Sequence, residues 1–192
     1  MTLTDSELMA QLQAGNDAAV EEISHRYGTE LRLFCQRMVY DASLAEDIVQ
    51  DVLLKCCRMS KQTRPSGSLR GWLYQVARNR SIDEIRRMHP KIRLSALATS
   101  RHLFERGAIP LDKKSTPAGQ AMKADRAQRV QMTIESMDEP LREVVILYFF
   151  QGLSREEVAE AVGLSLAGVK ARLSKATREL REHLKSFDDS SL

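Results

Sequence analysis

Hydrophobic residues recur every three to four positions along most of this 192-residue chain, which is the period of helices with one buried face. In the first half, the pattern predicts helices over residues 5–14, 17–38, 44–59 and 69–87. In the second half it predicts helices over 125–137, 138–151, 154–162 and 165–184, and the buried face of 138–151 is expected to include Val145, Tyr148 and Phe149. The fold is therefore predicted to be all-α.

The helical pattern fails in two places where proline and glycine break helices. Pro65 and Gly67 interrupt residues 61–68, which we interpret as a loop. Residues 88–127 contain three prolines and only weak periodicity, and a connection of this length favours a domain boundary. We predict a helical domain over residues 1–88, a linker over 89–124, a second helical domain over 125–185 and a tail over 186–192.

The segment Gly152–Arg178 has the pattern of a helix, a tight turn and a second, basic helix. Ser154 and Glu157 can form a capping box at the start of the first helix. Gly163 can end that helix with a positive φ, and Ser165 can cap the next one. This spacing predicts a helix-turn-helix that reads DNA. The alternative is an amphipathic hairpin with a solvated basic face.

The second helix of this motif divides its residues between two faces. The inner face is predicted to hold Val169, Leu173 and Ala176. Cationic side chains on the remaining surface can attract phosphates and reach base edges in the major groove. These cations are Lys170, Arg172, Lys175 and Arg178.

Two earlier helices also carry patterned polar residues. Trp72 and Tyr74 lie among five arginines in residues 69–87, and an unstacked base can stack on an aromatic ring while arginines hold the phosphates. Packing of Trp72 into the core is an equal alternative. The helix over 44–59 places an acidic stripe opposite its buried face, which fits either a docking surface for a basic partner or an ordinary solvated face. The stripe consists of Glu46, Asp47, Gln50 and Asp51.

The distribution of charge is more informative than the net charge of +3. Residues 61–95 hold nine basic and two acidic residues, and residues 164–185 are net +4. Residues 1–60 are net −5 and residues 129–163 are net −4. Two separate basic blocks favour two separate contacts with a polyanion.

Other chemistry is not indicated by the sequence. The three cysteines, an odd number, argue against a disulfide framework, although redox sensing by Cys56 and Cys57 stays open. The four histidines lack metal-ligand spacing, and we expect no metal and no cofactor. No signal peptide or apolar run of ~18 residues is present, so a cytoplasmic protein without membrane insertion is expected.

Three segments together resemble a bacterial sigma-70 family factor of the extracytoplasmic-function group. They are LAEDIVQDVLLKC over 44–56, SLRGWLYQVARNRSIDEIRR over 68–87, and residues 139–184 with the helix-turn-helix. The resemblance implies two all-helical domains, called region two and region four, joined by a flexible linker. It also implies three partners, namely core RNA polymerase, promoter DNA with minus-ten and minus-thirty-five elements, and an anti-sigma protein.

The resemblance assigns roles to particular residues of this chain. The acidic stripe is similar to the surface that binds the polymerase. Gly168 replaces the threonine that relatives often have at this position, which removes a hydroxyl from the start of the reading helix. Contacts with the minus-ten strand fall on Arg70, Trp72, Asn79, Asp83, Arg86 and Arg87. Contacts with the minus-thirty-five element fall on Ser165, Lys170, Arg172, Ser174, Lys175 and Arg178.

Two other classes of protein are alternatives to this interpretation. A stand-alone regulator that binds DNA as a dimer would explain residues 139–184 equally well, but not the acidic stripe followed by the aromatic and basic helix. A nucleic-acid enzyme lacks support, because the sequence shows no phosphate loop, no paired acids for a metal and no nucleophile with a base. We therefore expect a binding protein without catalytic residues.

Overall fold

The computed structural model describes residues 3–59, 67–87 and 128–189, with side chains described as far as residue 183. The elements in these ranges are all helical, and they include no strand. The predicted all-α fold is therefore confirmed. The proposed linker over 89–124 and most of the loop over 61–68 lie outside the described residues.

The first three helices are α1 (Asp5–Gln13), α2 (Ala18–Val39) and α3 (Ala42–Cys57). Thr4 and Glu7 form a capping box at the start of α1. Tyr40 ends α2 in the left-handed conformation, with φ of 58°. The Asp41 carboxylate then accepts the Leu44 amide at 2.9 Å, so the chain reverses and α3 packs along α2.

Helix α4 (Leu69–Arg87) packs its apolar side against α2 and α3. Ser68 caps it, because the Ser68 hydroxyl accepts the Gly71 amide at 2.9 Å. Tyr74 is fully buried and meets the Phe34 ring edge-on, with ring centroids 5.2 Å apart. The expectation that Tyr74 offers a stacking surface for a base is therefore wrong, since packing against α2 takes up its ring.

The second half contains a helix over 128–136, α8 (Glu139–Val145), η2 (Ile146–Phe150), α9 (Arg155–Val162) and α10 (Leu166–Asp189). Residues 138–151 were expected to form one α-helix, but η2 winds as a π-helix. Its wider turn rotates the side chains, so Leu147 is buried whereas Phe149 is 58% exposed. The predicted burial of Phe149 is therefore wrong.

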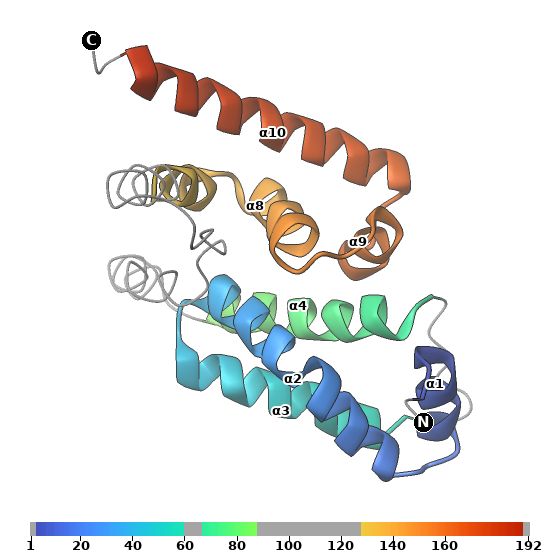
Figure 1. Ribbon diagram of the computed structural model, residues 1–192. Coiled ribbons are helices and arrows are strands. Elements are labelled where there is room, and N and C mark those ends of the chain that lie inside the picture. The colour runs from blue at the N-terminus through green and yellow to red at the C-terminus, as the bar shows by residue number, and fades with distance from the viewer. Residues whose placement is uncertain (1–2, 60–66, 88–127, 190–192) are drawn as a thin grey trace, which may run out of the picture.

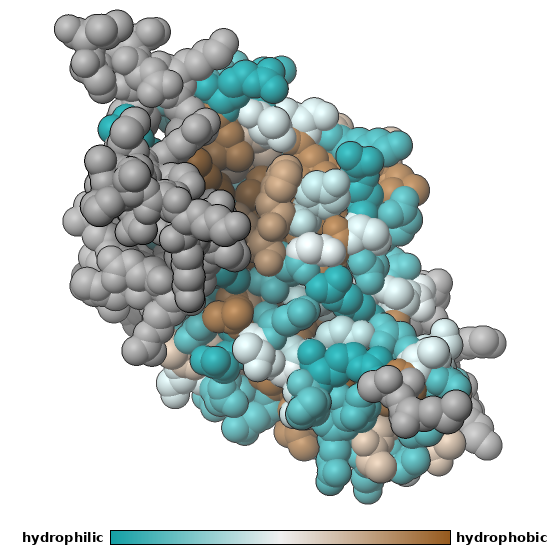
Figure 2. All heavy atoms as spheres, viewed as in Figure 1, coloured by the Kyte–Doolittle hydropathy of each residue, from teal (hydrophilic) through white to brown (hydrophobic). Residues whose placement is uncertain are grey.

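The two halves of the chain pack against each other, with α9 lying along α4. Figure 1 shows successive layers from α10 through α8 and α9 to α4, and then to α2 and α3. Leu73 of α4 belongs to the same buried cluster as Leu153 and Val158 of the second half. In the view of Figure 2, hydrophilic side chains dominate the lower half of the surface, and hydrophobic ones gather in the upper half. The shared core makes this a closed arrangement of the two halves.

Candidate nucleic-acid interface

The helix-turn-helix is built by local hydrogen bonds at three points. The Ser154 hydroxyl accepts the Glu157 amide at 3.1 Å, and the Glu157 carboxylate accepts the Ser154 amide at 2.8 Å. Gly163 ends α9 with φ of 70°, a conformation that a residue with a side chain rarely adopts. Ser165 then accepts the Gly168 amide at 3.2 Å and starts α10. The predicted caps and turn are confirmed.

The reading helix α10 has the predicted inner face, since Val169, Leu173 and Ala176 are all buried. Arg172 is half-buried and lies near Glu143, whose pKa is raised by burial while the charges of Arg78 and Arg172 oppose that rise. The charge of Arg172 therefore acts on a buried carboxylate of the protein, while its side chain stays half open to solvent. Five other positions assigned to the minus-thirty-five element are exposed, namely Ser165, Lys170, Ser174, Lys175 and Arg178.

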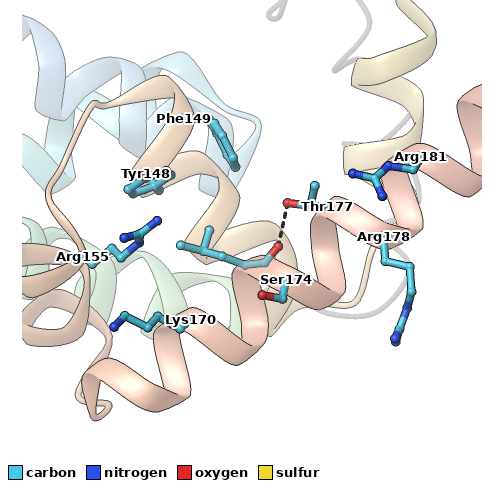
Figure 3. Close-up of a pocket in the computed structure, with 9 residues that line it drawn as sticks. Tyr148, Phe149, Arg155, Lys170, Ser174, Thr177, Arg178 and Arg181 are labelled. Carbon is cyan, nitrogen blue, oxygen red and sulfur yellow. Dashed lines mark hydrogen bonds between the residues drawn. The ribbon is translucent and has the colours of Figure 1, made fainter.

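A pocket of about 600 Å³ lies between η2 and α10, beside the exposed positions of the reading helix. Figure 3 shows Arg155 and Lys170 at one end of this pocket, below the ring of Tyr148. The Arg155 guanidinium lies 5.6 Å from the centre of the Tyr148 ring, a cation–π arrangement. The lining includes Tyr148, Phe149, Arg155, Lys170, Ser174, Arg178 and Arg181. The face thus combines four cations with two aromatic rings.

Residues of α4 that were assigned to the minus-ten strand fall into two groups. Trp72 is 8% exposed and lies in the hydrophobic core, as its packing interpretation expects. Arg70 donates to the Gln151 carbonyl at 2.6 Å and to the Gly152 carbonyl at 3.3 Å, so its side chain faces the second half of the chain. The other four positions are exposed on the last three turns of α4, namely Asn79, Asp83, Arg86 and Arg87.

The acidic stripe lies along α3, on the side away from its buried face. Glu46, Asp47 and Gln50 are exposed. Asp51 is half-buried and accepts the Arg80 guanidinium at 2.6 Å, which ties α3 to α4. Three of the four stripe residues are therefore open to a partner, whereas Asp51 also has a structural role.

The described residues were compared with the requirements for a metal site, a membrane span and a disulfide. They contain no group of His, Cys, Asp and Glu side chains arranged to hold a metal ion. None of their helices is long and apolar enough to cross a membrane. All three thiols are free; Cys57 is exposed, whereas burial raises the pKa of Cys35 and Cys56 to about 12.

Two family descriptions match this chain, and they match its two halves. Sigma-70 region 2 matches residues 23–89, and Sigma-70, region 4 matches residues 127–180. The matches cover the acidic stripe and α4 in one half and the helix-turn-helix in the other. The chain belongs to the sigma-70 family of RNA polymerase sigma factors, which are transcription initiation factors.

Individual relatives place the chain in the extracytoplasmic-function group. "ECF RNA polymerase sigma factor SigW" of Bacillus subtilis is 25% identical over 97% of this chain and 100% of its own length. "Probable RNA polymerase sigma factor RfaY" of Xanthomonas campestris is 31% identical over 77% of this chain, which spans 36% of that relative. The solved structure of CnrH in complex with the cytosolic domain of CnrY has the same fold, with a TM-score of 0.66, 22% identity and coverage of 95% of this chain and 97% of that one.

Some residues of the interface have no distinct signal in the sequence. Arg155 looks like an ordinary first-turn residue of α9, and Arg181 lies beyond the positions that we assigned to the reading face. Phe149 was placed inward because a helix of constant period puts it there. Only the π-helix and the packing of η2 beside α10 bring these side chains to one surface.

Proposed function

We propose that this protein directs core RNA polymerase to promoters through two DNA contacts and one protein contact. Helix α10 reads the minus-thirty-five element, and the exposed end of α4 holds the melted minus-ten strand. The acidic stripe of α3 binds a basic surface of the polymerase. The observation that carries the proposal is the exposed cationic side of α10. The turn at Gly163 positions α10 so that its apolar side is buried and this cationic side faces solvent.

The proposed function requires recognition of DNA and of a protein partner, and no covalent bond is made or broken. Lys170 and Ser174 lie on the first turns of α10, where a recognition helix enters the major groove. Arg178 lies further along and is placed to contact the phosphate backbone. On α4, Asn79 and Arg86 share the exposed side and supply a donor-rich surface for an unpaired strand.

The same proposal covers location and regulation. A factor that works with RNA polymerase acts in the cytoplasm. The family resemblance implies an anti-sigma protein, and the related CnrH has been solved with a second protein, the cytosolic domain of CnrY. An inhibitory protein partner is therefore part of this proposal, with its identity open.

Run-off transcription with purified core polymerase on a library of promoters tests the function directly. The wild-type chain should give transcripts from a subset that shares two short elements. Positive charge placed on the open part of the stripe, with Asp47→Lys and Gln50→Lys, should weaken polymerase binding. The free energy of unfolding should change little, because Asp51 and its ion pair with Arg80 are kept. Binding of the free protein to a two-fold site as a dimer, with no transcripts, would favour a stand-alone regulator instead.

A further inference from the structure

A chain of ion pairs connects α3 with the last turns of α4. The Asp51 carboxylate accepts Nε of Arg80 at 2.6 Å. Nη1 of the same guanidinium lies 2.9 Å from Oε1 of Glu84. The other oxygen of this carboxylate, Oε2, lies 2.9 Å from Nη2 of Arg87. Four side chains of alternating charge therefore link the acidic stripe to the exposed end of α4.

Glu84 is the buried centre of this chain of ion pairs. Its side chain is 5% exposed, whereas the side chain of Arg87 is 75% exposed. A buried carboxylate is costly unless neighbouring cations or hydrogen bonds compensate its charge. Each oxygen of Glu84 faces a different arginine, so Arg80 and Arg87 share the compensation of one negative charge.

The position of Arg80 between two carboxylates sets how firmly Glu84 holds Arg87. Asp51 draws the Arg80 guanidinium toward α3, and its hydrogen bond is the main reason why the pKa of Arg80 is raised. Once the charge of Asp51 is offset, Glu84 is the remaining ion-pair partner of Arg80 within the described residues. Arg80 then compensates Glu84 more fully, and the attraction of Glu84 for Arg87 weakens.

Both ends of this chain of ion pairs are open to partners. Asp51 has 43% of its side chain exposed, and it belongs to the stripe that we propose to bind a basic surface of the polymerase. Arg87 is one of the α4 positions that we propose to hold the melted minus-ten strand. A cation at the first end and a phosphate at the second each compete with an ion pair inside the protein.

We propose that Arg80 and Glu84 are positioning residues, which pass a change of charge at Asp51 on to Arg87. A cation bound at Asp51 moves the Arg80 guanidinium onto Glu84. Glu84 then releases Arg87, which binds a phosphate of single-stranded DNA. We call the four side chains the charge relay. Because binding free energies are reciprocal, a phosphate on Arg87 also favours a cation at Asp51. The two ligands rest on the proposed function, whereas the relay rests on the four side chains alone.

Nitrogen-15 NMR of arginine side chains in the full chain follows the relay without any ligand. Asp51→Asn removes the charge that a bound cation would offset. The Nη groups of Arg87, assigned by their loss in Arg87→Gln, should then rotate several-fold faster, because their pair with Glu84 is weaker. Asp47→Asn is the matched control, since Asp47 is exposed one turn earlier on α3 and forms no ion pair with any residue that the structure describes. This control should leave the rotation unchanged.

Fluorescence anisotropy of the full chain with a labelled, mixed-sequence single-stranded oligonucleotide supplies the second measurement. Asp51→Asn should bind several-fold more tightly than Asp47→Asn, although both variants lose one negative charge. Its logarithmic salt dependence should be steeper by up to about 0.7, the amount expected for one further phosphate contact. The difference between the two variants should vanish when Arg87→Gln is added to each. Equal urea midpoints of the two variants show that folding is not the cause.

Three results would overturn the relay. They are equal rotation of the Arg87 guanidinium in Asp51→Asn and Asp47→Asn, equal affinity of these variants for an oligonucleotide that the unchanged chain binds, and an affinity difference that survives Arg87→Gln. Faster rotation in Asp51→Asn alone, in a chain that binds no oligonucleotide and gives no run-off transcript, would support the relay and overturn the proposed function.

Discussion

Trp72 stands between arginines in the sequence, yet its ring lies in the core that α4 shares with its neighbours. Replacing a buried tryptophan by alanine removes a large apolar surface and leaves a cavity. We expect Trp72→Ala to lower the free energy of unfolding by about 3–5 kcal/mol, measured by urea denaturation. Asn79→Ala, at an exposed position of the same helix, should change it by less than about 0.5 kcal/mol.

A different result for the Trp72→Ala variant would contradict the burial of this ring. If Trp72→Ala kept its stability but failed to open promoters, as followed by permanganate reactivity of thymines, the ring would belong to the DNA interface. The sequence left these roles open because an aromatic residue among arginines fits both. Burial decides between them, and burial depends on α2 and α3, which the local pattern around Trp72 does not contain.

The three cysteines differ in environment, and this difference predicts their reactivity. The thiolate is the reactive form, and burial raises the pKa of Cys35 and Cys56 to about 12, so both remain thiols near pH 8. Iodoacetamide at pH 8 should therefore modify only Cys57 in the folded chain, and all three cysteines in urea. Mass spectrometry counts the adducts, and rapid native modification of Cys56 would show that α3 opens locally.

At the scale of elements, the helical period and the capping residues were sufficient to predict most helices of the described ranges. Ser154 with Glu157, Gly163, and Ser165 act locally, within three or four residues, so the helix-turn-helix could be predicted in detail. The π-helix η2 could not be predicted, because a periodicity argument assumes a constant helical period. Packing against neighbouring elements decides where the helix widens. The pocket of Phe149 and Arg155 was missed for the same reason.

The reading helix carries a prediction that separates base contacts from phosphate contacts. Lys170 is exposed near the start of α10, where base edges are within reach, and a lysine on guanine contributes about 1–3 kcal/mol of discrimination. Lys170→Ala should therefore change the preferred base in the minus-thirty-five element. Arg178→Ala should lower affinity for all sequences and reduce the salt slope by about one.

These two effects can be distinguished by measuring how the full chain with core polymerase binds single-base promoter variants at several salt concentrations. The variants report base preference, for Lys170→Ala, and the salt series reports loss of a phosphate contact, for Arg178→Ala. Lys175→Ala is a useful comparison, because Lys175 is exposed on the same helix and lies 3.9 Å from Glu179. Retained base preference in Lys170→Ala together with altered preference in Arg178→Ala would mean that α10 is shifted in the groove.

At the scale of the whole molecule, the sequence predicted two helical regions but not how they meet. The contact joins Ser68 to Glu160, 92 positions apart, and Arg78 to Glu143, 65 positions apart. Periodicity and capping describe neighbours within a few residues, so they contain no information on such pairs. The sequence shows a basic block over residues 61–95 and an acidic one over residues 129–163, but the basic block was interpreted as a contact with an external polyanion.

The buried pair between the halves predicts a dependence of stability on pH. Glu143 is 3% exposed, and burial raises the pKa of its carboxyl while Arg78 opposes that rise. Removal of Arg78 leaves the buried carboxylate without the cation that binds it, which typically costs about 3–5 kcal/mol. The charge of Arg172, which also acts on Glu143, remains. In Arg78→Met the pKa of Glu143 should rise further above its ordinary value of 4.5, so the folded chain binds a proton more tightly than the unfolded chain.

The stability of Arg78→Met relative to wild type should therefore recover as pH falls from 7.5 to 5 and be lost again as pH rises through the raised pKa of Glu143. Urea midpoints at both pH values measure this, and comparison with wild type removes effects of other groups. The double variant Arg78→Met with Glu143→Gln should regain most of the lost stability and show no such recovery, because the buried carboxylate is gone. A deficit that is the same at pH 5 and 7.5 would mean that Glu143 reaches water when Arg78 is removed, which would place the two halves further apart than in this structure.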